Sequence, residues 1–207
     1  MAGKMTDRKK LILRALRLEW FTAGWMLIEA GVAIGSGIAA HSLTLIVFGA
    51  DSVIELLSAC LLLWRLDLEL RRREDFSEAT ERVATRAGAI LLIGLTLYVV
   101  LSAGWSLVRG TAQEFSAPGL ALAVLAIPAM YALAKAKRRV ADAIGSAALR
   151  ADAAESIACG YLSGVVVIGL LAQWLIGAWW IDGVSALALT PFLIKEAREA
   201  WEGGDED

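Results

Sequence analysis

Apolar residues form six long runs along the chain, and short segments with charged or turn-forming residues separate them. A helix rises about 1.5 Å per residue, so about 17–25 apolar residues cross a hydrocarbon core about 30 Å thick. All six runs reach that length, which predicts an all-α, polytopic membrane protein with six transmembrane helices. The predicted spans are 18–40, 43–64, 85–108, 117–134, 154–176 and 179–195.

The links between neighbouring runs are short, and the charges in them give an orientation. Residues 40–42 and 177–178 are too few to do more than reverse the chain, so they predict antiparallel hairpins. Of the twenty Lys and Arg residues, all but Arg109 fall on one side of the predicted bundle. Positively charged loops stay in the cytoplasm, so we expect both chain termini there. This divides the chain into a basic cytoplasmic arm (1–17), a membrane domain (18–196) and a short acidic cytoplasmic tail (197–207).

Composition agrees with a membrane protein. Hydrophobic residues make up 58% of the chain, charged residues only 20%, and the mean hydropathy is +0.62. We therefore expect an integral membrane protein, in the cytoplasmic (inner) membrane of a prokaryote. The sequence has no nucleophile with a histidine base and no phosphate-binding glycine loop, which argues against an enzyme. Because topology already explains the basic loops, we expect no nucleic-acid partner.

Two of the apolar runs contain acidic residues at helical spacing. Asp51 and Glu55 lie in the second run, and Asp152, Glu155 and Cys159 lie in the fifth. An ionisable group in hydrocarbon costs roughly 2.5 kcal/mol or more, so such groups normally have a function. Residues four apart share one helix face, and no basic residue lies in the interior of a predicted span to neutralise them. The two runs therefore predict oxygen and sulfur donors for a divalent cation, or groups that carry protons.

The other polar residues in or beside the spans allow several interpretations. Asp152 lies nearer the cytoplasmic loop and is either an entrance group or a neighbour of the ligands. Glu29, in the first span, is a further ligand, a proton acceptor or a hydrogen-bonded contact to another helix. His41, in the outer turn, is either an ordinary surface residue or a metal contact on the exit side. Asp182 is expected to favour the positive end of the sixth helix.

Both cysteines fall inside predicted helices, which argues against a disulfide. Cys60, near the inner end of the second span, is expected to be a packing residue. Cys159 lies one turn after Glu155 and is a candidate ligand. A thiolate among carboxylates favours zinc first and cadmium second, while cobalt, iron and manganese stay open.

Three stretches resemble helices of the cation diffusion facilitator family: Ser42–Glu55 (SLTLIVFGADSVIE), Arg150–Ser163 (RADAAESIACGYLS) and Trp180–Leu187 (WIDGVSAL). The resemblance implies a homodimeric exporter that exchanges cytoplasmic divalent cations, usually zinc, for protons. Carried over residue by residue, its metal site is Asp51, Glu55, Glu155 and Cys159. Glu55 stands where the family usually has Asp, and Glu155 with Cys159 where it has His or Asp followed by Asp.

The resemblance also bears on assembly. We expect a short branch of the family that lacks the cytoplasmic C-terminal domain, so that membrane helices hold the dimer. Two alternatives stay open at this point. One is a proton-coupled exporter of another cation, such as an organic cation, and the other is a membrane protein that binds metal without transporting it.

Overall fold

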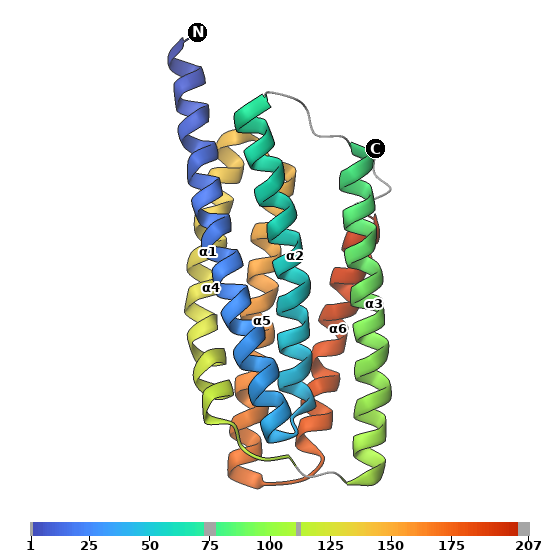
Figure 1. Ribbon diagram of the computed structural model, residues 1–207. Coiled ribbons are helices and arrows are strands. Elements are labelled where there is room, and N and C mark those ends of the chain that lie inside the picture. Colours follow the sequence, from blue (N-terminus) through green and yellow to red (C-terminus); the bar gives the residue numbers. More distant parts are fainter. Residues whose placement is uncertain (1, 73–77, 111–112, 203–207) are drawn as a thin grey trace.

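Six helices run side by side in one elongated bundle (Figure 1). The computed structural model describes residues 2–72, 78–110 and 113–202. The start of α1 and the end of α6 lie at the same end of the bundle, as an even number of antiparallel helices requires. The all-α prediction is confirmed. The helices are α1 (Ala2–Ala40), α2 (Leu43–Arg72), α3 (Glu78–Arg109), α4 (Ala117–Ile144), α5 (Ala147–Ile176) and α6 (Ile181–Glu202).

The helices extend well beyond the apolar runs that predicted them. The basic segment before residue 18 continues α1 without a break, and α4 runs ten residues past its predicted end at 134, to Ile144. Hydropathy marks the apolar part of a helix, whereas backbone hydrogen bonding continues into its charged ends. By length and composition, α1 to α5 are each suited to cross a membrane. The shorter α6 carries several charges near its end, and by the same criterion of length and composition it does not qualify as a membrane span. It packs along α3 and α5.

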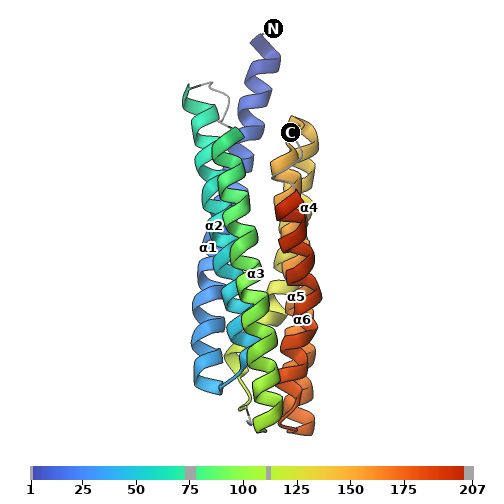
Figure 2. The same ribbon diagram turned by 90° about the vertical axis from the view of Figure 1, so that its right-hand side faces the viewer.

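The most extensive packing joins α1 to α2, α4 to α5 and α3 to α6. The last pair is distant in sequence yet adjacent in space, as both views show (Figure 2). A sharp turn joins α4 to α5: Gly145 ends α4 with a φ of 73°, and the Ser146 hydroxyl accepts from the amide of Leu149 at 3.2 Å. Phe48, Met26 and Met130 are among the largest side chains that fill the core.

Two glycines bring α1 and α2 into very close contact. A Cβ atom at Gly37 would lie 2.8 Å from the backbone nitrogen of Ile46, and one at Gly49 would lie 2.9 Å from that of Ile34. Both distances are shorter than real Cβ contacts allow, so a larger residue at either position would push the helices apart. This hairpin fixes the depth of α2, which carries the acidic pair, against α1.

Asp182 joins the start of α6 to the start of α2. Its carboxylate accepts hydrogen bonds from the Ser42 hydroxyl at 2.8 Å, the Leu43 amide at 2.6 Å and the Thr44 amide at 3.1 Å. The prediction that Asp182 favours the positive end of its own helix is therefore incomplete: the residue lies in the first turn of α6, and its carboxylate also caps α2. Amides in the first turn of a helix have no partner within that helix, and a buried carboxylate satisfies them well.

Replacing Asp182 with Ala is expected to destabilise the protein by about 2 kcal/mol, since the charged cap of a buried helix start is lost. For a domain of this size that corresponds to a Tm about 4–8 °C lower, measured by thermal unfolding in detergent. The matched control is Asp142→Ala, which removes an exposed ion pair to Arg150 and should change the Tm little. Equal shifts in both variants would show that the cap is not important.

Candidate metal centre

The acidic pair of α2 is buried inside the bundle. Asp51 is only 2% exposed, and its Oδ1 atom is buried without a hydrogen-bond partner. Glu55, one turn further along, is partly buried, and its Oε1 atom also has no partner. Unpartnered carboxylate oxygens in a protein interior are costly, so both positions suit a bound cation or proton.

The facing residues of α5 include a buried thiol. Cys159 is 1% exposed, and its Sγ lies 3.3 Å from Oε1 of Glu29 on α1, to which it donates. Glu155, one turn before it, is partly buried. Cys60, expected to be a packing residue, is instead exposed on α2. The two thiols thus differ sharply in environment, and only Cys159 lies among acidic groups.

Glu29 connects three helices. It is fully buried and accepts from the Trp25 indole nitrogen at 2.6 Å and from the Ser52 hydroxyl at 2.8 Å, in addition to the Cys159 thiol. Of the three interpretations that the sequence left open, the contact to neighbouring helices is the one that these hydrogen bonds directly display. Sequence reasoning missed Trp25 and Ser52, although Trp25 lies one turn before Glu29 on the same face.

The acidic groups form one electrostatic neighbourhood across four helices. Asp51, Glu29 and Glu155 are all near enough to Glu55 for their negative charges to disfavour a charge on its carboxyl. Glu196 near the end of α6 acts on it too, and one of its carboxylate oxygens is buried without a partner. Glu196 follows the last predicted span, 179–195, and is not among the candidate residues predicted from the sequence. Like charges at this density repel unless protons or a cation neutralise them.

The four predicted ligands do not form a single coordination shell in this structure. Among the residues that the structure describes, no three His, Cys, Asp or Glu side chains are close enough together to hold one metal ion. α2, which carries Asp51 and Glu55, packs against α5, which carries Glu155 and Cys159. Ion binding by the predicted set of four would therefore require these helices to move closer.

Asp152 has a partner that the sequence analysis excluded. From the sequence, Lys137 is predicted in the cytoplasmic loop between the fourth and fifth spans, and no basic residue is expected in the interior of a span. That was wrong: α4 continues past residue 134, and Lys137 is fully buried on its inner face. Its Nζ lies 2.5 Å from Oδ2 of Asp152 and 3.4 Å from Oε2 of Glu19 on α1. Asp152 is thus half of an ion pair, and Glu19 joins it.

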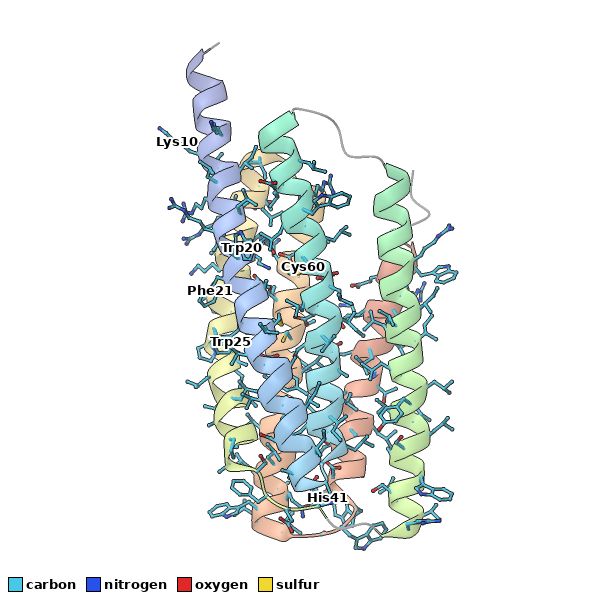
Figure 3. All side chains as sticks on the ribbon, viewed as in Figure 1. Lys10, Trp20, Phe21, Trp25, His41 and Cys60 are labelled. Carbon is cyan, nitrogen blue, oxygen red and sulfur yellow. The ribbon has the colours of Figure 1, made fainter. Side chains whose placement is uncertain are left out.

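His41 lies at the opposite end of the bundle from the basic start of α1, which Lys10 marks (Figure 3). It is exposed in the α1–α2 turn, with a left-handed φ of 54°. It lines a cavity of about 610 Å³ together with Ser106, Asp182 and residues of α1, α2 and α3. The Asp182 carboxylate in that cavity already caps α2. The structure therefore separates His41 from the acidic groups of the bundle interior.

Comparison with known families identifies the chain. The profile described as the cation efflux transmembrane domain matches residues 21–204. The chain belongs to the cation efflux family. Comparison with curated proteins gives no match. The match covers α2 to α6 and the second half of α1, which carry Asp51, Glu55, Glu155, Cys159 and Glu29, and it confirms the resemblance to cation diffusion facilitators.

Family membership establishes the general function. This cation efflux protein is an integral membrane transporter of cations. The family consists of transporters rather than enzymes. A metal ion is therefore its substrate, and the lipid bilayer is its surroundings.

Proposed function

We propose that this cation efflux protein exports divalent metal ions from the cytoplasm in exchange for protons, with zinc as the first substrate and cadmium as the second. The observation that carries the proposal is the pair of buried, unpartnered oxygens on Asp51 and Glu55, which lie among further carboxylates. A divalent cation would satisfy these oxygens and neutralise the repulsion between the groups. Cobalt, iron and manganese are further candidate substrates.

We assign four ligands to the transported ion: Asp51 and Glu55 from α2, and Glu155 and Cys159 from α5. The two helices already pack together, so a modest closure would bring their donors around one ion. Zinc takes four such ligands at about 2.0–2.3 Å, and a thiolate among them favours zinc or cadmium over ions that prefer oxygen alone. In the metal-free protein Glu29 accepts from the Cys159 thiol, so it would hold the sulfur in place until the thiol loses its proton to bind the ion.

Competition between the ion and protons at the same groups would couple the two fluxes. A thiol and carboxyls in the bundle interior can each hold a proton or share the charge of the metal, but not both. Moving two charges outward against about 100 mV costs roughly 4.6 kcal/mol, and each returning proton offsets about 2.3 kcal/mol. Protons entering from outside would therefore help to release the ion there.

We also propose a homodimer held by membrane helices, in the inner membrane of a prokaryote. α3 exposes several large apolar side chains over its length, among them Leu97, Tyr98 and Leu101, that a second copy could cover. Native mass spectrometry of protein released from lipid nanodiscs should give two chains per particle. A single chain per particle would contradict the dimer.

Proteoliposome flux tests the proposal against both alternatives. With a gradient of protons across the membrane, the purified protein should move zinc and cadmium against the direction of proton flow, as read by dyes for metal and for pH. An exporter of organic cations would move those cations and no metal, whereas a metal-binding protein that does not transport would bind zinc without flux. Metal flux no faster than in empty liposomes would contradict the proposed function.

A further inference from the structure

A charged cluster outside the proposed ligand set joins α1, α4 and α5. Lys137 and Glu19 are both completely buried, and Asp152 is nearly so. The Lys137 ammonium contacts both carboxylates, at 3.4 Å from Glu19 and 2.5 Å from Asp152. A buried lysine is costly unless it is paired, so this cluster must be satisfied by its own members.

The cluster has more acidic than basic groups. Two carboxyls share one ammonium, and the Oε1 atom of Glu19 is buried without a hydrogen-bond partner. An ammonium is a single charge on a flexible four-carbon stem, whereas a divalent cation would neutralise both carboxylates at once. The two carboxylates therefore resemble a cation site whose present cation is the ammonium of Lys137.

The position of the cluster relates it to the candidate metal centre. Asp152 precedes Glu155 by three residues on α5, so their side chains lie one above the other on the same face. The charge of Lys137 also acts on Glu155. Asp152 lies between Glu155 and the α4–α5 turn, which is at the same end of the bundle as the start of α1 (Figure 1). An ion moving from that end towards Glu155 would reach Asp152 first.

We propose that Glu19 and Asp152 form a second divalent-cation site on the cytoplasmic side of the metal centre, and that Lys137 is the tethered cation that occupies it until a metal ion displaces it from Asp152. Glu19 would hold the ion through its Oε1 atom, which has no partner, while its Oε2 atom keeps the displaced ammonium paired inside the bundle. The direction of ion movement rests on the proposed function, whereas the binding site does not. The site contains no sulfur or nitrogen donor apart from the lysine that leaves it, so it would bind cadmium more weakly than the thiolate-containing metal centre does.

Cadmium titration of the purified protein by equilibrium dialysis tests this site directly. The wild-type protein should bind one ion tightly and a second weakly, because the second ion must displace Lys137. Asp152→Asn, which keeps the Lys137–Glu19 pair, should lose only the weak ion. Lys137→Met removes the competitor and should tighten the weak site at least about tenfold, since two buried carboxylates then lack their cation.

Two further variants complete the test. Lys137→Met combined with Asp152→Asn should return to one ion, and Lys135→Met, which changes an exposed lysine of the same helix, should bind as the wild type does. A folded Lys137→Met variant without a tighter second site would overturn the proposal. If that variant does not fold, equal ion numbers in the wild type and in Asp152→Asn would overturn it instead. None of these binding results depends on flux, so a failure of transport alone would leave them interpretable.

Discussion

Asp51→Asn should reduce zinc transport at least about 100-fold, because removal of groups that merely support a metal ligand already costs 10–100-fold. Asn has nearly the same volume but no charge, and the Oδ1 atom of Asp51 has no hydrogen-bond partner that the change would remove. Glu155→Gln should have an effect of the same order. The measurement is the initial rate of zinc uptake into proteoliposomes under a proton gradient.

The matched control for these variants is Asp142→Asn, which neutralises an exposed carboxylate near the end of α4. It should transport at the wild-type rate. Elution as a single species and an unchanged Tm would show that each variant is folded. Normal flux in folded Asp51→Asn or Glu155→Gln would remove that residue from the proposed site.

Cys159→Ser should lower cadmium transport at least about tenfold while manganese transport changes little, because a thiolate prefers soft ions and a hydroxyl does not. Serine can still donate a hydrogen bond to Glu29, so the contact between α5 and α1 is kept. Relative rates of the two ions in the same proteoliposomes give the measurement. The control is Cys60→Ser, which changes the exposed thiol of α2 and should leave both rates as they are.

The outcome that would contradict a ligand role for Cys159 is an equal loss for both ions. Such a loss would mean that the substitution disturbs the helix contact rather than the metal. An unaltered cadmium rate would place the thiol outside the path of the ion altogether.

The sequence predicted the fold well because burial in lipid and helix geometry act locally. Six apolar runs correspond to six helices, and the position of the basic residues agrees with the common end of the first and last helices. The helix ends were less well predicted. Hydropathy does not register a helix that continues past its apolar part, as α1 does over its basic start and α4 does over its last turns.

Lys137 lies in a part of α4 that hydropathy does not predict as helix. It precedes Arg138 and Arg139, so composition alone assigns it to a basic loop. Helical periodicity, continued past residue 134, would have placed it on the inner face of α4. The positions one turn away on either side, Leu133, Ala134, Val140 and Ala141, are all buried as Lys137 is. The helical periodicity that places Lys137 on the inner face is thus present in the sequence, but it lies beyond residue 134, where the predicted span ends.

The partners of Glu29 and Asp182 could not be predicted from local sequence. Glu29 accepts from Ser52 on α2 and Cys159 on α5, and Asp182 accepts from residues about 140 positions earlier in the chain. Such contacts depend on which helices are neighbours in space, and periodicity within a single helix does not determine that. The same holds for Glu196, which joins the acidic neighbourhood only because α6 packs against α2.

The most direct test of the central claim is anomalous X-ray scattering at the zinc edge from crystals of the zinc-bound protein. The proposed centre predicts that the strongest peak lies between α2 and α5, within about 2.0–2.3 Å of donors from Asp51, Glu55, Glu155 and Cys159. A strongest peak that contacts none of these four residues, for example one at His41 in the outer turn, would contradict it.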